Sequence, residues 1–336
     1  MARDLSHRGF WQVPRHRLAG FVLGLLALVA VGANLLASDL PLYVELDGRS
    51  YVLACVTRPA GLGGLRNADL EKLVGGRVRH LVQPPVPFGP LQTDITVRPL
   101  SRPDRTHWLG TDRVGRDVLA RLIHGARTSL AVGLLATALA ALVGLGIGAL
   151  AGFTGGWTAA VLGGAMEVVQ TFPVLFLLLG VMALAPDAGL LVLIAVLGLT
   201  RWIEMGRLAR AEAMRVCAQE YVLAARALGS TARRIFFVHV LPAALGPVLV
   251  SASLEVGTLV LIESALSFLG FGVPAPTASW GELLSQARSQ PGAWWLAVAP
   301  GVCIFAVVAA CNVLGEGARE AASRGPEASA PGLPGR

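Results

Sequence analysis

The residues that could do chemistry are few, and the densest group is the string HWLGTDRVGRDVLARLIHGAR from His107 to Arg127. Its two carboxylates, Asp112 and Asp117, could act together as a general acid and a general base. Neither a nucleophile, a partner histidine nor metal-ligand spacing accompanies them, and a catalytic site needs such a constellation. The sequence therefore predicts no catalytic residue and no metal site, and the chain is not expected to be an enzyme.

Other polar residues stand inside strongly apolar segments, where they are candidates to line a translocation path: Glu167, Gln170, Glu255 and Glu263. A charge near the centre of a bilayer costs about 2.5 to 3.5 kcal/mol on insertion scales, so such residues usually face a cavity or a partner. Glu255 and Glu263 differ by only about 80° around one helix and could face the same path. The alternative is that they lie near the membrane interfaces or pair with Arg and Ser neighbours.

The sequence contains no GxxxxGK[ST] loop, the motif that binds the phosphates of ATP. No cofactor is therefore expected in this chain, and any ATP and Mg²⁺ would be bound by partner subunits. The four cysteines, Cys55, Cys217, Cys303 and Cys311, show neither CxxC spacing nor a metal pattern, and we expect four free thiols.

The composition indicates a protein that crosses the membrane several times. The 336 residues are 54% apolar and only 15% charged, with a mean hydropathy of +0.63. The net charge of +7 could suggest nucleic acid, but the Arg residues are scattered among apolar segments without a basic and aromatic module. We therefore expect the chain to contact a lipid bilayer and not to bind nucleic acid.

Hydropathy predicts six membrane spans, with both termini inside. A cleaved signal peptide is the alternative for the first span. The predicted organisation is a cytoplasmic N-terminus at 1–17, a first span at 18–37, an external loop at 38–125, a core at 126–318 and a disordered cytoplasmic tail at 319–336. The core contains the other five spans, two of which are predicted at 161–185 and 189–205.

The long external loop is predicted to contain two local structures. Asp39 to Tyr51 favours a hairpin around Asp47 and Gly48, the strongest turn signal of the region. In the string after His107, we expect an amphipathic helix on the membrane surface, capped by Thr111 or Asp112, because Val114, Val118, Leu119 and Leu122 recur at helical spacing.

A charged interruption lies between the fourth and fifth spans, and we call Glu220 to Pro242, EYVLAARALGSTARRIFFVHVLP, the docking segment. Good helix formers predict a helix from Tyr221 to Leu228, which Gly229 would end in a left-handed conformation. Ser230 or Thr231 would cap a second helix, and Pro242 would open the next span. The plainer alternative is an ordinary basic loop on the inner side of a membrane protein.

The order of residues in the docking segment resembles the "EAA" loop of permeases from ABC importers, with Leu223 at the position of the glutamate. The strings YVLAARALG and HVLP resemble the dipeptide, oligopeptide and nickel branch, and LGTDxxGRDVLxRLIxGAR resembles the signature of its C-type subunit. The resemblance implies an all-α integral membrane protein with six transmembrane helices of the type I importer fold. Its extended external loop resembles that of the microcin C-type peptide branch.

Site residues also follow from this resemblance. The residues implied to couple to an ATPase are Tyr221, Ala224, Ala225, Arg226, Gly229, His239, Leu241 and Pro242, and the signature residues are Gly110, Thr111, Asp112, Gly115, Arg116 and Asp117.

The resemblance implies a bacterial inner-membrane permease subunit of an ATP-driven importer of peptides. Its implied partners are a paralogous permease subunit, two ATPase subunits or domains and an external solute-binding protein. Nickel or another small solute is the alternative cargo. A secondary transporter would need an inverted repeat, and the two halves show no clear self-similarity.

Overall fold

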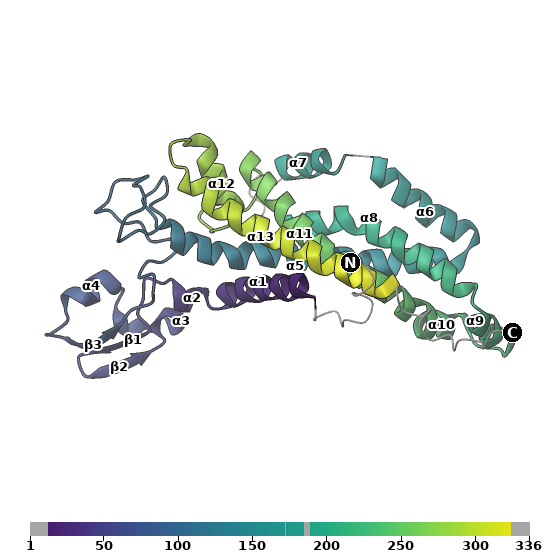
Figure 1. Ribbon diagram of the computed structural model, residues 1–336, viewed down its shortest axis with the longest axis horizontal. Coiled ribbons are helices and arrows are strands. Elements are labelled where there is room, and N and C mark those ends of the chain that lie inside the picture. The colour runs from purple at the N-terminus through teal and green to yellow at the C-terminus, as the bar shows by residue number, and fades with distance from the viewer. Residues whose placement is uncertain (1–12, 172, 185–188, 324–336) are drawn as a thin grey trace.

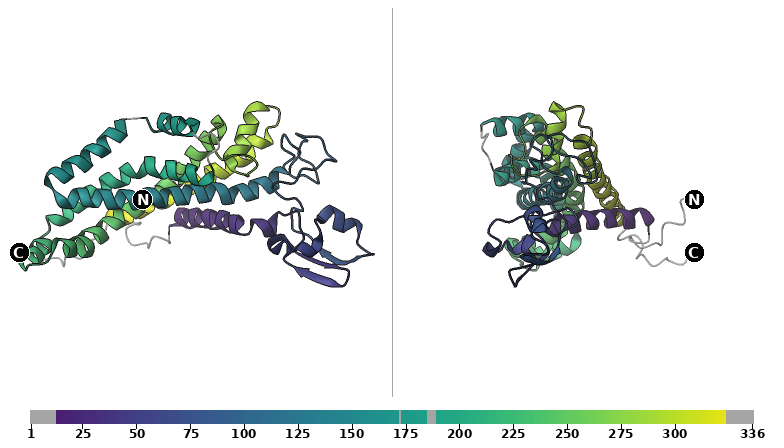
Figure 2. Two further views of the ribbon diagram at one scale, coloured as in Figure 1. Left: turned by 180° about the vertical axis from the view of Figure 1, so that it is seen from behind. Right: turned by 90° about the vertical axis from the view of Figure 1, so that its left-hand side faces the viewer.

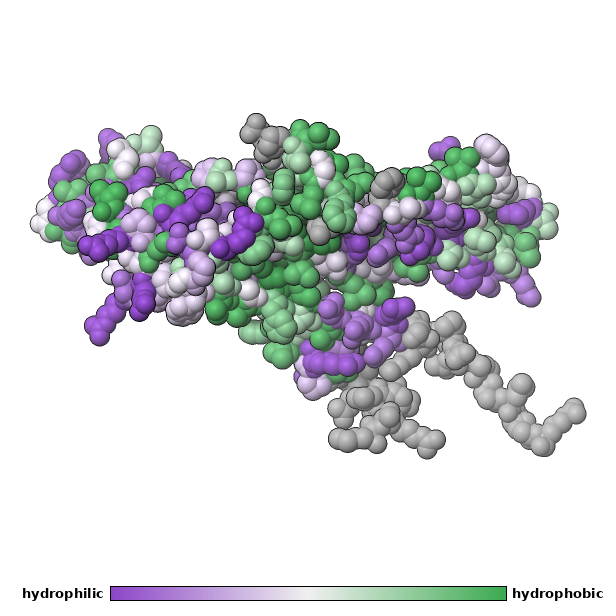
Figure 3. Space-filling model, turned by 90° about the horizontal axis from the view of Figure 1, so that it is seen from above, coloured by the Kyte–Doolittle hydropathy of each residue, from purple (hydrophilic) through white to green (hydrophobic). Residues whose placement is uncertain are grey.

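The computed structural model describes residues 13–171, 173–184 and 189–323, which form an elongated and mostly helical molecule (Figure 1). Apolar residues dominate the middle of the long axis, and polar residues gather toward both ends (Figure 3). We call the end that carries the β-strands the sheet end, and the opposite end the α9 end. A central apolar belt between polar ends is the surface expected of a protein that crosses a bilayer.

The described residues form α-helices and two short helices of other types, η2 and η3. They are α1 Pro14–Val31, α2 Ala33–Leu36, α3 Ala54–Thr57, η2 Ala60–Leu62, α4 Asn67–Lys72, α5 Val118–Thr154, α6 Gly156–Thr171, α7 Val174–Leu184, α8 Leu190–Cys217, α9 Glu220–Ala227, α10 Ala232–Ile235, η3 Phe236–Val240, α11 Leu241–Leu269, α12 Trp280–Ser289 and α13 Trp295–Ser323.

Four stretches of the described chain are helical, long and apolar enough to cross a membrane: Pro14–Val31, Val118–Thr154, Ala232–Leu269 and Trp295–Ala321. The predicted span 161–185 is divided between α6 and α7, because Pro173 lies at the break and lacks the N–H that a continuous helix needs. The predicted span at 189–205 corresponds to the first part of α8, which carries Arg201 and Glu204. The chain is therefore a multi-pass membrane protein.

Helix α5 runs through the middle of the bundle, with α8, α11 and α1 packed along it (Figures 1 and 2). Its approach to α8 depends on glycine: a Cβ on Gly144 would lie 2.6 Å from the carbonyl oxygen of Trp202, and one on Gly148 would collide with the backbone of Gly206. Small residues let helix backbones come close in lipid, where there is little hydrophobic force between helices. Helix α5 is a single uninterrupted helix that extends from the sheet end toward the α9 end (Figure 1).

A small α/β unit occupies the sheet end. The strands β1 Tyr43–Leu46, β2 Arg49–Val52 and β3 Val78–Val82 form an antiparallel sheet in the order β2-β1-β3. The predicted hairpin is confirmed, with Asp47 and Gly48 at φ 50° and 77° in its two-residue turn. The third strand was not predicted, and the chain is therefore all-α only outside this unit. The core of the unit is formed by apolar residues of the strands and of α4, including Val44, Leu46, Leu70 and Val78.

The helix expected around residues 107–127 differs from the prediction. Helix α5 begins only at Val118, where the Asp117 carboxylate accepts a hydrogen bond of 2.7 Å from the amide of Ala120, and it continues into the bundle. Gly110 and Gly115 have φ values of 69° and 83°, so the chain before Val118 is a turn. A surface amphipathic helix is therefore the wrong description, and the helix begins inside the stretch that was expected to be loop 38–125.

The start of α1 lies close to the last turns of α13, because Arg15 is 3.4 Å from Glu320. Helix α13 extends to Ser323, so residues 319–323 of the predicted disordered tail are helical. The rest of that tail, and residues 1–12, lie outside the described residues. All four cysteines are free thiols, as predicted.

Candidate functional site

The docking segment forms two short helices at the far tip of the α9 end (Figure 1). Helix α9 ends in a Schellman motif: the amide of Ser230 donates to the carbonyl of Ala225 at 3.0 Å, and that of Gly229 to Arg226 at 3.1 Å. Gly229 has φ 82°, the left-handed conformation that was predicted. Thr231 then caps α10 by accepting a hydrogen bond from the amide of Arg234 at 3.3 Å.

Apolar side chains hold the docking segment to the bundle. Val222 of α9, Ile235 of α10 and Val240 of η3 are buried against Ala213 and Val216 of α8. The opposite face of α9 is open, and Leu228 at its end is 88% exposed. Isolated exposed leucines are ordinary on protein surfaces, and this one stands beside Gly229 in the projecting turn.

The predicted coupling residues divide between this open face and the anchor. Tyr221 and His239 are brought together, with their rings 5.7 Å apart in an edge-to-face contact. Leu241 packs beside the buried anchor residues. The remaining predicted residues are exposed or partly exposed: Ala224, Ala225, Arg226 and Gly229 in α9 and the turn after it, and Pro242 at the start of α11.

The predicted path residues lie in three separate places, two of them buried inside the bundle and one on the exposed face of α6. Glu255 of α11 accepts hydrogen bonds of 2.6 and 3.2 Å from Arg201 of α8, so it forms a bidentate ion pair inside the bundle. Glu263 is fully buried and accepts hydrogen bonds from Ser267 at 2.9 Å and from Ser129 at 3.3 Å. Both carboxylates thus have Arg or Ser neighbours as partners within the chain, which was the alternative left open by the sequence.

Glu167 and Gln170 stay on the exposed face of α6. Gln170 accepts a hydrogen bond of 3.1 Å from Arg207 of α8, which joins the two helices. Arg201 and Ser129 were not singled out by the sequence reasoning. Arg201 could have been found, because a cation within an apolar run needs a counter-ion.

The signature residues build a turn at the sheet end. The Asp112 carboxylate accepts hydrogen bonds from the amides of Val114 at 2.8 Å and of Arg116 at 2.9 Å. Burial alone would raise the pKa of Asp112, but these amides and the Arg116 guanidinium hold that pKa below its usual value. Thr111 fixes the turn from the other side, accepting from the amide of Ser101 at 2.9 Å.

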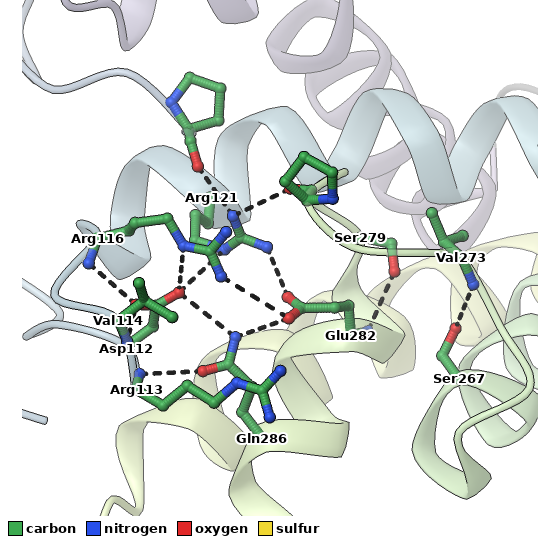
Figure 4. Close-up of polar contacts among 12 residues, drawn as sticks. Asp112, Arg113, Val114, Arg116, Arg121, Ser267, Val273, Ser279, Glu282 and Gln286 are labelled. Atoms are coloured by element: carbon green, nitrogen blue, oxygen red, sulfur yellow. Dashed lines mark hydrogen bonds and ion pairs between the residues drawn. The ribbon is translucent and has the colours of Figure 1, made fainter. Parts of the chain in front are cut away.

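The charge cluster, which we define as Asp112, Arg116, Arg121, Glu282 and Gln286, joins this turn to α12 (Figure 4). Arg116 lies 2.7 Å from Asp112, and Arg121 lies 2.6 Å from Glu282 and 3.5 Å from Asp112. Gln286 donates to Glu282 at 2.7 Å. Two carboxylates and two guanidinium groups balance in charge, which is the condition for keeping such groups buried.

A histidine does accompany Asp117, contrary to the prediction from the sequence. The Nδ1 atom of His107 is 2.8 Å from Asp117, and its Nε2 atom is 3.4 Å from Asp94. The hydrogen bond with Asp117 raises the pKa of His107 above its ordinary value. Because the ring is fully buried between two carboxylates, its contacts fasten the chain before Val118.

Comparison with known proteins agrees with this architecture. The family described as "Binding-protein-dependent transport system inner membrane component" matches residues 144–325. The oligopeptide transport system permease protein OppC of Bacillus subtilis is 37% identical over 65% of this chain and 72% of its own. The dipeptide transport system permease protein DppC of Alkalihalophilus pseudofirmus is 36% identical over 70% and 79%.

A distant likeness exists to the crystal structure of an amino acid ABC transporter with histidines, with a TM-score of 0.44 and 21% identity over 61% of this chain and 92% of that chain. The family match covers more than half of the chain, and both curated relatives are matched over more than two thirds of their length. The chain therefore belongs to the family of binding-protein-dependent transport system inner membrane components.

Proposed function

We propose that the chain is a permease subunit of an ATP-driven importer and forms half of a translocation path for peptides. The observation that carries the proposal is the docking segment: two capped helices that project from one end and expose Leu228 and the outer face of α9. Family membership, and relatives named as oligopeptide and dipeptide permeases, support the choice of peptides as cargo. Nickel or another small solute is the second candidate within the same class.

In this proposal, the energy comes from two ATPase subunits or domains, which bind ATP and Mg²⁺ and contact the docking segment from the cytoplasm. The α9 end is then cytoplasmic, together with both termini, and the sheet end faces the extracytoplasmic binding protein. A paralogous permease subunit supplies the other half of the path. Closure of the ATPases would displace α9 and α10, and the bundle would rock between outward and inward access as a rigid body.

Glu167, Gln170, Glu255 and Glu263 are proposed to border the path. Glu167 and Gln170 are exposed in the single chain and could face the paralogous subunit across it. Glu255→Gln would leave Arg201 without its full counter-charge, and Glu263→Gln would keep the shape of its site. If both variants assemble normally and transport peptide at the wild-type rate, these two residues have no part in the path.

A crosslinking experiment tests the docking role. Single cysteines at Ala225 and Leu228, in a chain whose native cysteines are replaced by serine, should crosslink to the ATPase in membranes, with a yield that changes when ATP is added. A matched cysteine at Val52, which is 64% exposed on β2 at the sheet end, should give no such product. Absence of a crosslink from both docking positions in a complex that still transports would refute the role.

Uptake into proteoliposomes tests the cargo. The complete complex with its binding protein should accumulate labelled short peptides only when ATP is present on the ATPase side. Accumulation of nickel and not of peptides would replace the proposed cargo by the second candidate. Uptake driven by an ion gradient without ATP would show a secondary transporter and overturn the proposal.

A further inference from the structure

A cavity of about 380 Å³ lies near the sheet end, between α7, α12 and the loop that follows α11. Its volume falls at the lower end of the range for small-molecule sites, about 300 to 1,000 Å³. It lies on the far side of the molecule from the docking segment, so it does not belong to the coupling surface (Figure 1).

The walls of this cavity differ in polarity. One wall is apolar and includes Met182 of α7 together with Phe271 and Val273 of the loop. The other wall is polar and includes Arg113 and the α12 residues Ser285 and Gln286. A mixed cavity of this kind suits a small group with a charged end and an apolar side chain.

Arg113 is the surplus charge at the cavity. Its amide donates to Gln286 at 3.1 Å, which fixes the backbone beside α12, while its side chain is exposed (Figure 4). Across the described part of the chain, no carboxylate lies within ion-pair distance of its guanidinium group. Glu282 also lines the cavity, but Arg121 at 2.6 Å and Arg116 at 4.0 Å already neutralise it.

We propose that Arg113 and this cavity bind the terminal carboxylate of a peptide as it leaves the binding protein, with the last side chain against Met182 and Phe271. A guanidinium group offers two parallel N–H donors to a carboxylate, and such charge-assisted bonds are stronger than neutral ones. The hydrogen bond to Gln286 holds the backbone of Arg113 in place before the ligand arrives. This inference rests on the proposed function and adds to it the part of the substrate that the subunit recognises.

The test compares an alanine tripeptide that has a free carboxylate with its C-terminal amide, in proteoliposomes that contain the complete complex. Arg113→Gln should lower ATP-dependent uptake of the free acid by about tenfold, the size expected when one charge-assisted contact is lost. Uptake of the amide, corrected for its affinity for the binding protein, should change less than twofold. Arg102→Gln, an exposed arginine of the preceding loop that does not line the cavity, is the matched control and should alter neither.

Other outcomes would overturn the inference in distinguishable ways. Equal loss of acid and amide, with weaker attachment of the binding protein, would mean that Arg113 contacts an acidic residue of that protein. Unchanged uptake of the acid by Arg113→Gln would show that the cavity does not act on substrate, while the proposed function would stand. Failure of the wild-type complex to import either peptide would remove the proposed function, and the inference with it.

A second readout places the ligand in the cavity. In a chain without native cysteines, Ser285→Cys should react with a membrane-impermeant thiol reagent, and the loaded binding protein should slow that reaction by at least threefold with the free acid but not with the amide. Protection that is the same with both peptides would contradict carboxylate recognition at this position.

Discussion

At the sheet end, ion pairs and hydrogen bonds join α5 to α12 through buried side chains, whereas at the α9 end a cluster of buried apolar side chains packs the docking segment against α8. Arg121 is fully buried and also donates to the carbonyl of Pro90 at 2.8 Å, so it ties three segments together. Val222, Ile235 and Val240 at the other end are held by apolar contacts, which have no preferred direction. Directional contacts suit a part that keeps its shape, and non-directional contacts suit a part that is displaced.

The largest expected effect comes from breaking the charge cluster. Arg121→Met would leave Glu282 and Asp112 with one guanidinium between them, and such a loss costs about 3 to 5 kcal/mol of unfolding free energy. The unfolding temperature of the purified complex in detergent should fall accordingly. Arg233→Met, on the exposed face of α10, should change the free energy by less than about 0.5 kcal/mol. Equal effects of the two substitutions would contradict the contrast between the ends.

The next largest effect concerns the turn at Gly229 in the docking segment. Gly229→Val would place a β-branched residue at φ 82°, at a cost of about 1 to 3 kcal/mol that is confined to the turn, because no atom lies within 4 Å of the new Cβ. We expect insertion and assembly to persist while ATP-dependent uptake falls at least about threefold. Gly229→Asn, which tolerates the left-handed conformation, should retain most of the uptake. If Gly229→Val transports like the wild type, the shape of this turn does not matter for coupling.

A third effect depends on pH. The pKa of His107 is raised from 6.5 by its hydrogen bond with Asp117, so the protonated ring stabilises the folded state, fully below the unfolded pKa. That contribution should be lost as the pH rises from about 6.5 through the higher folded pKa. Unfolding temperatures measured between pH 6 and 9 should therefore show a downward slope that His107→Gln reduces and that His80→Gln, at an exposed position on β3, leaves in place. A slope that persists in His107→Gln would assign the effect to another group.

The smallest expected effect on the unfolding temperature is that of a substitution at Leu228, at the exposed end of α9. Leu228→Ser removes a side chain that is 88% exposed, so the unfolding temperature should stay within the range of surface substitutions. Binding of the ATPase, measured by copurification, should nevertheless weaken severalfold if Leu228 enters a pocket of the partner. Full copurification together with normal uptake would show that Leu228 contributes nothing to the contact.

The docking segment was largely predictable from the sequence because its rules are local. One glycine at the end of a run of good helix formers was enough to place Gly229 correctly, and the structure selects Thr231 from the two predicted caps, Ser230 and Thr231. The two-residue turn at Asp47 and Gly48 was predictable for the same reason, since its conformation depends on the turn residues themselves.

The structures that the sequence did not reveal depend on partners distant in the chain. The spacing of Val114, Val118 and Leu122 suggested a helix, but the Asp112 carboxylate binds nearby amides and favours a turn instead. Arg201 forms an ion pair with Glu255, which lies 54 positions away in the chain, and the spacing of apolar residues along one helix cannot predict such a pair. Strand β3 likewise becomes evident only once β1 offers an edge to it.

The length of α5 has a consequence for the lipid around the protein. Its 37 residues extend about 55 Å at 1.5 Å per residue, whereas the hydrocarbon core of a bilayer is about 30 Å thick. The helix must therefore tilt or stand well into the headgroup layers, and a thicker bilayer can be accommodated by reducing the tilt. Transport by this subunit should accordingly tolerate longer lipid acyl chains better than a subunit whose central helix only just spans the membrane.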